Sequence, residues 1–430
     1  MKKSGLLMML TCCLMGSFSP SLVLADDLYG QEDIMTITRK AGEDISETYK
    51  PKADILVDAY SGQILYGDHI DMSRDPGSMT KLMSAYVILQ AIKAGKISYD
   101  TKIQATARDV SIAINPEISN SPIIEGHSYQ VRDLLRMMLI PSSSAATLMV
   151  ANHLTKDDPD AWLDQMNDWA QKLGMTNTHW NNASGAVAAV FNGDYSPTRY
   201  DNDAYNETTP RDMAILGTHV VREFPELLEI TKNASMTILK GTDEEQLIQN
   251  YNNSLEGGKF PLKGADGLKT GSSPHADYNY MVTVERKGQR FVEVIMGVGT
   301  YDDLIAEDLR HPIGNALAEK MYATYDYKKI LSKGEQVIDG KTYLLDKDFY
   351  GAVKKGDKPS LIVQNGRLIV NNGLKPLSSK LPVGLKVQEV TAKSQQKSRF
   401  GWTNLFILLP ILILVLVFRH DQRKYGYQWK

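Results

Sequence analysis

The chain has 430 residues, of which 43% are hydrophobic and 23% are charged, and its formal net charge is −3 at pH 7. This length exceeds one typical domain and favours about two folded units with a sizeable hydrophobic core. The nearly balanced charge offers no basic surface for a polyanion, so we expect no nucleic-acid partner.

The N-terminus has the pattern of a secretory signal peptide. Two lysines precede an apolar stretch over residues 6–24, and a small-residue cleavage pattern ends at Ala25. We therefore expect residues 1–25 to be a signal peptide that is removed. Both cysteines, Cys12 and Cys13, lie inside it. The mature protein is then expected to have no disulfide, no catalytic thiol and no cysteine metal site.

Apolar periodicity and turn residues predict the elements that follow. Residues 26–50 are polar and acidic and indicate a flexible leader, and residues 53–67 alternate around Ser61-Gly62 as a β-hairpin does. The further expected elements, in chain order, are a helix from Ser78 to about Gly95, a helix over 131–139, a helix that follows residues 141–146 and runs to about 153, a helix over 160–173, a long surface loop over 176–208, a helix over 210–228, a strand at 236–239, strands at 280–285 and 290–297, a helix over 302–322, and short strands over 335–390.

A Ser-x-x-Lys spacing lies at the start of the first of these helices. Asp75 or Ser78 is available as its N-cap, and Ser78 and Lys81 would lie on one helical face. A serine hydroxyl becomes a good nucleophile only when a neighbour accepts its proton, and a lysine accepts it only if burial or a nearby cation lowers its pKa. The same spacing recurs at Ser394 and Lys397, so the spacing alone does not identify this chemistry.

Two later motifs add to the pattern. A serine-rich turn covers residues 142–144, and Lys269-Thr270-Gly271 lies between a glycine-containing turn and a predicted strand pair. A fixed cation and hydroxyl suit a substrate carboxylate, and glycine permits close backbone approach. A solvated lysine in a turn is the ordinary interpretation of one such tripeptide. The order Ser-x-x-Lys, serine-rich turn, Lys-Thr-Gly is instead typical of penicillin-recognising serine acyltransferases.

Over roughly residues 50–390 the chain resembles the low-molecular-mass penicillin-binding proteins, which are serine D-alanyl-D-alanine carboxypeptidases. Further segments similar to that family are the hairpin at 53–67, Gly-Met-x-Asn-Thr-His at 174–179, Thr-x-Arg-Asp-Met at 209–213 and Asp-Gly-Leu-Lys-Thr-Gly at 266–271. The resemblance implies an α/β (α+β) serine transpeptidase/β-lactamase-like domain with a central antiparallel sheet flanked by helices. A small all-β domain and a C-terminal membrane helix are expected to follow it.

The resemblance also implies roles for individual residues. Ser78 is expected to attack the carbonyl between the two D-alanines of a peptidoglycan stem peptide, with Lys81 as general base and Ser142 as proton relay. The backbone N–H groups of Ser78 and Ser272 would form the oxyanion hole. Water would then resolve the acyl-enzyme, no metal or other cofactor is implied, and β-lactam antibiotics would acylate the same serine. The expected substrate-binding residues are Ser144, Lys269, Thr270, Gly271 and Ser272.

Ser144 departs from the family pattern, whose middle motif is Ser-x-Asn. An asparagine amide has a donor and an acceptor at longer reach than a serine hydroxyl. We therefore expect weaker or altered catalysis. The sequence after Gly271, from residue 272 to 277, also differs from the family and leaves substrate preference there open.

Four functions stay open at this point. The carboxypeptidase leads, and a transpeptidase would use the same acyl-enzyme with an amine as acceptor. A class A β-lactamase would need a glutamate to activate water, and the one matching spacing is Glu229 to Asn233. A non-catalytic wall-binding protein is the fourth. The sequence contains neither His-Glu-x-x-His nor Gly-x-Ser-x-Gly, which argues against a zinc peptidase and a Ser-His-Asp hydrolase.

The C-terminus predicts a membrane anchor. Residues 402–418 are almost wholly apolar and basic residues follow them, although Pro410 lies in the middle and the alternative is a buried core helix. With the signal peptide, this predicts a single-pass protein whose body is extracellular, facing the cell wall, and whose tail at 419–430 is cytoplasmic. We expect the catalytic domain at 51–325 and the small β domain at 335–390.

Overall fold

The computed structural model describes residues 32–390, together with residues 416 and 420. The predicted signal peptide, membrane anchor and cytoplasmic tail lie outside the described residues, apart from those two positions. In the described part of the chain, no helix has both the length and the hydrophobicity that crossing a bilayer requires.

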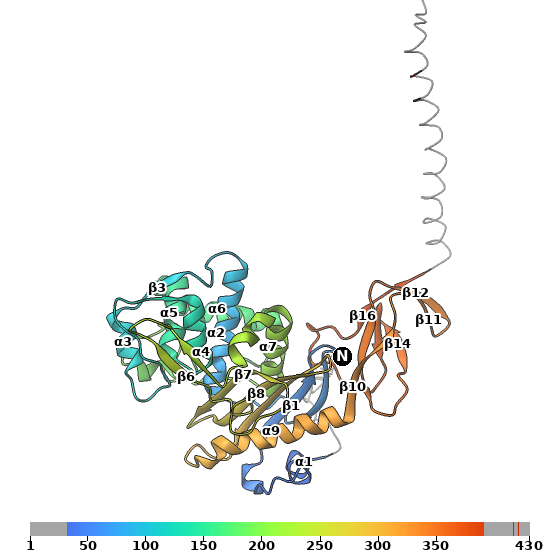
Figure 1. Cartoon of the computed structure of the whole chain (residues 1–430), viewed down its shortest axis with the longest axis horizontal. Coiled ribbons are helices and arrows are strands. Elements are labelled where there is room, and N and C mark those ends of the chain that lie inside the picture. The colour runs from blue at the N-terminus through green and yellow to red at the C-terminus, as the bar shows by residue number, and fades with distance from the viewer. Residues whose placement is uncertain (1–31, 391–415, 417–419, 421–430) are drawn as a thin grey trace, which may run out of the picture.

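A five-stranded antiparallel sheet forms the middle layer of the larger domain, in the order β2-β1-β9-β8-β7 (Figure 1). Its strands are β1 Ala53–Asp58, β2 Gln63–Asp68, β7 Ala265–Ser273, β8 Asp277–Arg286 and β9 Gln289–Val298. Both predicted hairpins are present. Side chains alternate between the two faces of a strand, and β1 is buried along its whole length, so both faces of the sheet are covered.

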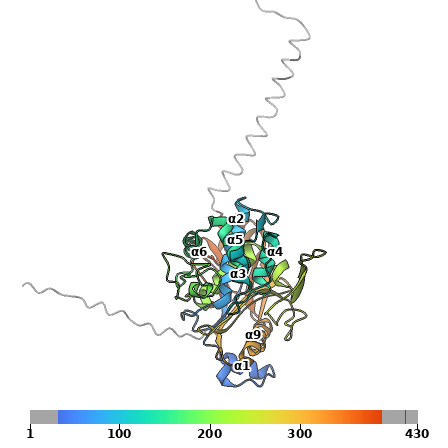
Figure 2. The same cartoon turned by 90° about the vertical axis from the view of Figure 1, so that its left-hand side faces the viewer.

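Helices cover these two faces. They are α1 Ile34–Lys40, α2 Thr80–Lys93, α3 Ala107–Ala113, α4 Val131–Leu139, α5 Ser144–Thr155, α6 Pro159–Leu173, α7 Pro210–Glu223, α8 Leu228–Thr231 and α9 Ile305–Thr324. Ile55 and Val57 of β1 belong to the core that contains α2 and α4 to α7, whereas Leu56 belongs to the core beneath α9. Figure 2 shows the two groups, with α2, α4, α5 and α6 on one side and α1 and α9 on the other. The expected helix-flanked antiparallel sheet is thus confirmed.

Two segments differ from the sequence prediction. Part of the predicted flexible leader is folded, because α1 buries Ile34 and Met35 completely in the core beneath α9. The predicted surface loop at 176–208 is largely irregular, yet Trp180 is fully buried. Asn206 explains how this loop is held, since its amide donates to Thr80 Oγ1 at 2.9 Å and to Asn182 Oδ1 at 2.9 Å. Side-chain amides thus add to the isolated backbone pairing of His179 with Glu207.

The predicted helix over 210–228 is also shorter than expected. It ends at Glu223, because Phe224 precedes Pro225 and takes a non-helical φ of −137°. The remaining short elements of this domain are the 3₁₀ turns η1 Glu47–Tyr49, η2 Gly77–Met79, η3 Ala188–Phe191 and η4 Pro225–Leu227, and strands β3 Lys102–Gln104, β4 Ser128–Gln130, β5 Ser235–Ile238 and β6 Gln246–Gln249.

The C-terminal part is an all-β domain with its own small core, as predicted, but its first strand begins at residue 325. Its strands are β10 Tyr325–Leu331, β11 Gly334–Ile338, β12 Lys341–Leu345, β13 Phe349–Lys354, β14 Leu361–Gln364, β15 Arg367–Val370, β16 Leu385–Lys386 and β17 Gln388–Glu389. The domain docks on the β1–β2 hairpin (Figure 1). Ile64 donates its backbone N–H to Lys375 O at 2.9 Å, and Leu377 donates to Gly62 O at 2.9 Å.

Candidate active site

Ser78 lies in the 3₁₀ turn η2, which leads directly into α2. Neither Ser78 nor Asp75 is the N-cap, contrary to the sequence prediction, because η2 begins after Pro76 and α2 after Met79. Asp75 has a different role. Its carboxylate accepts from Gly77 N at 2.9 Å and from Ser273 Oγ at 2.9 Å, and so ties η2 to strand β7. The Ser78 hydroxyl is therefore not used as a cap.

Lys81 is the partner of Ser78. Its Nζ donates to Ser78 Oγ at 3.1 Å and to Ser184 O at 2.7 Å, and the side chain is only 1% exposed. Burial lowers the pKa of Lys81 to about 7. Near neutral pH a large fraction of this amine is consequently uncharged and able to accept a proton. Ser184 belongs to the segment that was predicted to be a surface loop.

Strand β7 passes directly beside the Ser78 turn, and two glycines permit it. A Cβ at Gly271 would lie 2.2 Å from Pro76 O and 3.1 Å from Ser78 N. Gly77 has a φ of +52°, and a Cβ there would lie 3.0 Å from Ser272 N. Side chains at these positions would push η2 and β7 apart. Because of this close approach, the backbone nitrogens of Ser78 and Ser272 both lie where η2 meets β7.

The serine-rich turn contributes one residue to this site. Ser142 has a left-handed φ of 66°, and its Oγ is buried without a hydrogen-bond partner in the described part of the chain. Buried polar atoms are ordinarily paired, so an unpaired hydroxyl beside a cavity indicates a functional position. Ser143 is the N-cap of α5 and accepts from Ala146 N at 3.1 Å. Ser144 is the first residue of that helix.

A cavity of about 220 Å³ connects these groups. Six of the eight predicted site residues line it: Ser78, Ser142, Lys269, Thr270, Gly271 and Ser272. Lys81 lies behind Ser78. Ser144 does not line the cavity, and its backbone N–H donates instead to the carbonyl of Ser119, which does line it, at 3.0 Å. The structure therefore brings together every predicted site residue except Ser144.

Arg310 of α9 is a cavity residue that the sequence prediction missed. Its guanidinium donates to Ser272 Oγ at 3.0 Å and to Asn279 O at 3.1 Å, and Glu307 Oε1 lies 3.2 Å from it. The side chain is fully buried, and burial lowers its pKa to about 10, so it stays cationic at neutral pH. One signal was available in the sequence, because Arg310 falls on the apolar face of α9 with Ala306, Ile313 and Leu317.

Lys269 is the third buried cation at the cavity. Its Nζ donates to Thr270 O at 3.0 Å, and the side chain is 1% exposed. Burial lowers the pKa of Lys269 well below its usual value, and the nearby Lys81 and Arg310 lower it further. Of the three, Arg310 keeps its positive charge at neutral pH and lines the cavity, which favours binding of an anionic group there.

Comparisons with known proteins agree on one family. Residues 39–300 match the model of peptidase family S11, D-alanyl-D-alanine carboxypeptidase, and residues 327–388 match a domain of unknown function, DUF1958. The D-alanyl-D-alanine carboxypeptidase DacA of Haemophilus influenzae is 27% identical over 79% of this chain and 81% of its own length. DacA of Escherichia coli is 30% identical over 66% of this chain and 62% of its own length.

A solved structure shares the fold. The peptidoglycan synthesis regulatory factor PBP3 of Streptococcus pneumoniae superposes with a TM-score of 0.66 at 23% identity, over 79% of this chain and 97% of its own. At this identity the likeness establishes the architecture of the sheet, the helices and the C-terminal β domain.

Proposed function

The chain belongs to peptidase family S11, the D-alanyl-D-alanine carboxypeptidases, and from this membership we propose that it removes the terminal D-alanine of peptidoglycan stem pentapeptides through an acyl-enzyme on Ser78. The observation that carries this proposal is the 3.1 Å hydrogen bond between Lys81 Nζ and Ser78 Oγ. A buried lysine whose pKa is about 7 is a competent base for a serine nucleophile at neutral pH.

In the acylation step, Ser78 Oγ attacks the carbonyl carbon between the two D-alanines, and Lys81 Nζ takes the hydroxyl proton. Negative charge then develops on the carbonyl oxygen. The backbone N–H groups of Ser78 and Ser272 are the donors that we assign to this oxyanion, and the close approach at Gly77 and Gly271 supports the assignment. Fixed donors of this kind stabilise the transition state more than the substrate.

Departure of D-alanine requires a proton on its amine. We assign this transfer to Ser142, which receives the proton from Lys81 and gives its own to the leaving nitrogen. The unpaired, buried Ser142 Oγ at the cavity supports this role. Water then attacks the acyl-enzyme, with Lys81 again as base. The same acyl-enzyme would serve a transpeptidase if an amine replaced water.

The carboxylate of the terminal D-alanine needs a cationic partner. The pKa of Lys269 is lowered strongly, whereas Arg310 keeps its charge and presents a planar guanidinium to the cavity. We therefore assign the carboxylate to Arg310 together with the hydroxyls of Thr270 and Ser272, and Lys269 lines the same cavity as a hydrogen-bond donor. This extends the sequence prediction, which named Lys269 and Thr270.

β-Lactams mimic the same dipeptide and are proposed to acylate Ser78 and leave slowly. Rapid release of the kind seen in class A β-lactamases would need a glutamate beside the acyl-enzyme. Glu229, the sequence candidate, has a side chain that is 73% exposed, pairs with Lys232 at 2.6 Å and does not line the cavity. The geometry therefore favours a penicillin-binding enzyme over a β-lactamase.

We also propose that the protein is secreted through residues 1–25 and held at the membrane through residues 402–418, with the catalytic domain facing the cell wall. Support for this comes from the sequence: the basic, apolar and small-residue order at the N-terminus, and the apolar stretch with basic flanks at the C-terminus. The C-terminal β domain would then lie between the catalytic domain and the bilayer.

The test uses the full chain purified in detergent, a fluorescent penicillin and a D-Ala-D-Ala stem pentapeptide. We expect a covalent adduct by intact mass and release of D-alanine from wild type, and neither from Ser78→Ala. The matched control is Ser394→Ala, which removes the serine of the second Ser-x-x-Lys spacing and is expected to behave as wild type. A folded wild-type protein that forms no adduct would overturn the proposal and favour a non-catalytic wall-binding role.

A further inference from the structure

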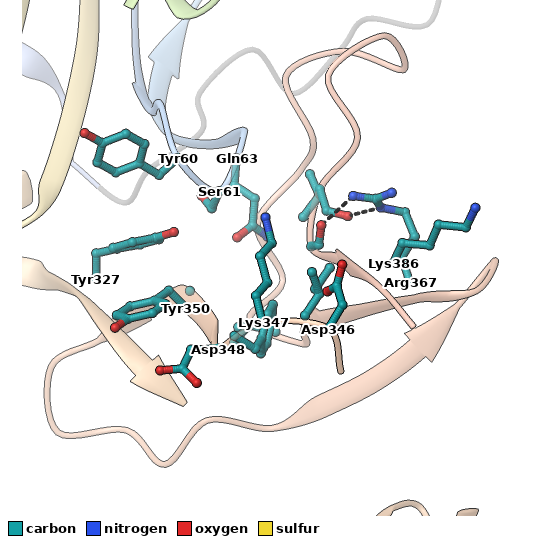
Figure 3. Close-up of a pocket in the computed structure, with 16 residues that line it drawn as sticks. Tyr60, Ser61, Gln63, Tyr327, Asp346, Lys347, Asp348, Tyr350, Arg367 and Lys386 are labelled. Carbon is teal, nitrogen blue, oxygen red and sulfur yellow. Dashed lines mark hydrogen bonds between the residues drawn. The ribbon is translucent and has the colours of Figure 1, made fainter. Parts of the chain in front are cut away.

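A second cavity, of about 560 Å³, lies where the C-terminal β domain meets the β1–β2 hairpin (Figure 3). We name it the interdomain cavity. It shares no lining residue with the active-site cavity. Its volume falls within the range of about 300–1,000 Å³ that is usual for small-molecule sites, so it has room for a short oligomer rather than a single ion.

One wall of the interdomain cavity is aromatic. Tyr60, from the hairpin, lies 5.7 Å between ring centroids from Tyr327, which is stacked on Tyr350 at 5.8 Å with an interplanar angle of 20°. Tyr327 and Tyr350 belong to β10 and β13. Tyr60 and Tyr350 are 39% and 44% exposed. Both rings are therefore partly open to solvent at this wall, where a ligand could contact them.

The opposite side is polar and charged (Figure 3). Arg367 is held in place by the carbonyls of Val383 and Gly384. Lys347, Lys386 and Asp346 line the cavity, and within residues 32–390 none of the three forms an ion pair or a side-chain hydrogen bond. These side chains supply donors and an acceptor that the protein itself does not use.

The hairpin side is held by its own hydrogen bonds. Ser61 is 8% exposed, and its backbone N–H donates to Asp58 Oδ1 at 2.6 Å. The neighbouring Gln63 is fixed, since its amide donates to Asn372 Oδ1 at 3.0 Å. This bond and the backbone pairing around it tie the two walls together, so the cavity is formed by the fold rather than by a loose contact.

We propose that the interdomain cavity binds a carbohydrate chain, the amino-sugar strand of the cell wall, as a docking site separate from the peptidase site. A pyranose ring has an apolar C–H face and a rim of hydroxyl and amide groups. The tyrosine rings can stack on the apolar face of the sugar, because the negative face of an aromatic ring attracts C–H dipoles. Lys347, Asp346 and Lys386 can form hydrogen bonds with the hydroxyl and amide groups at the rim of the sugar. The ligand class rests on the proposed function, since the stem peptides of that reaction are attached to such a strand.

Most of the lining residues fall within residues 327–388, the part that matches a domain of unknown function. Docking there would give this domain a role in substrate capture. A strand held at the interdomain cavity raises the effective concentration of its stem peptides at the active site of the same molecule.

The test measures binding of an N-acetylglucosamine hexamer, which contains no peptide, to the full chain carrying Ser78→Ala, by isothermal titration in detergent. We expect saturable binding that Tyr350→Ala weakens about tenfold, as loss of an aromatic contact does. Lys347→Ala should weaken it as well. Lys347 is exposed, and within residues 32–390 its side chain forms no ion pair or hydrogen bond, so Lys347→Ala should leave the fold intact. This variant stays informative if Tyr350→Ala destabilises the small domain.

The control is Lys358→Ala, an exposed lysine of the same domain outside the cavity, which should bind as the parent does. The proposal fails if the folded Lys347→Ala and Tyr350→Ala proteins keep full affinity, if a penicillin blocks binding in a chain with Ser78 intact, or if poly(glycerol phosphate) binds and the sugar does not. The sugar and poly(glycerol phosphate) titrations use the Ser78→Ala chain, in which the peptidase reaction is removed beforehand, so their outcomes are independent of whether the proposed activity is found.

Discussion

The two cavities hold their charged groups in opposite ways. At the active site, Lys81, Lys269 and Arg310 are each at most 1% exposed, and burial lowers the pKa of all three. At the interdomain cavity, Lys347 and Lys386 are exposed. Burial changes the proton affinity of a cation, as catalysis requires, whereas exposure preserves charge and mobility, as suits reversible contact with a flexible polymer.

Burying three cations costs free energy of folding, and this cost falls on the larger domain. A buried cation loses its hydration and needs compensating contacts. Lys81 has the Ser184 carbonyl, Lys269 has the Thr270 carbonyl, and Arg310 has several acceptors in β7, β8 and α9. The sheet and the helices around it are what fix these acceptors in place. The small β domain, with its own limited core, contains no comparable group among the residues that line the interdomain cavity.

The largest effect is expected from Lys81→Met, which keeps the bulk of the side chain and removes the base. Penicillin acylation should fall by about 10²–10⁴-fold, the usual contribution of a general base. Stopped-flow acylation measures it. Lys93→Met, on the exposed part of the same helix, is the control and should react as wild type does. If Lys81→Met kept the wild-type acylation rate, the buried lysine would not be the base, and the proposed difference in role between buried and exposed cations would be wrong.

Arg310→Gln should come next. Hydrogen bonds to a charged group contribute about 1.5–3 kcal/mol, so kcat/KM for a peptide with a free C-terminal carboxylate should fall roughly ten- to a hundredfold. A peptide ending in an amide should lose much less, and this difference separates carboxylate recognition from a general loss of structure. Equal losses for both peptides, with an unchanged melting temperature, would contradict the assignment.

The pH dependence of acylation follows from Lys81. Its folded pKa lies below the ordinary lysine value, at about 7, so the amine becomes available as pH rises through 7. Below that point the acylation rate should fall about tenfold per pH unit, and above it the rate should level off. Rates between pH 5 and 9 measure this. A rate that still rises about tenfold per pH unit up to pH 9, with no levelling, would show that Lys81 is not desolvated.

Ser144→Asn restores the family motif. If the amide reaches the cavity that the serine does not line, one added hydrogen bond of about 0.5–1.5 kcal/mol should raise the acylation rate roughly two- to tenfold. Ser144→Ala, which adds no amide, should show no gain. The measurement is the second-order rate constant for acylation by penicillin. An unchanged value in Ser144→Asn would contradict the hypothesis that Ser144 weakens catalysis.

The smallest effect on chemistry is expected from the double variant Lys347→Ala with Lys386→Ala. These residues share no partner with the active site, so the penicillin acylation rate should stay within about twofold of wild type. A larger change would mean that the two cavities are coupled, and the comparison between them would no longer separate catalysis from docking.

The sequence by itself determined the local features. The Ser78–Lys81 pair depends on a spacing of three residues, the strand pair turns at Lys287-Gly288, and Gly174 ends α6 with a φ of +86°. Each depends on backbone geometry within a few residues, which neighbouring side chains encode directly. The Lys-Thr-Gly motif was recognised in the same way, as a short ordered pattern.

Only the tertiary structure decided what surrounds these features. Lys81 meets the carbonyl of Ser184, 103 residues away, and Arg310 reaches Ser272 across 38 residues. It also placed Ser144 outside the cavity lining, folded part of the leader beneath α9 and buried Trp180 within the segment at 176–208. Such contacts depend on how the sheet and helices pack. No local pattern specifies which distant carbonyl or cation will face a given residue, because burial and register are properties of the whole fold.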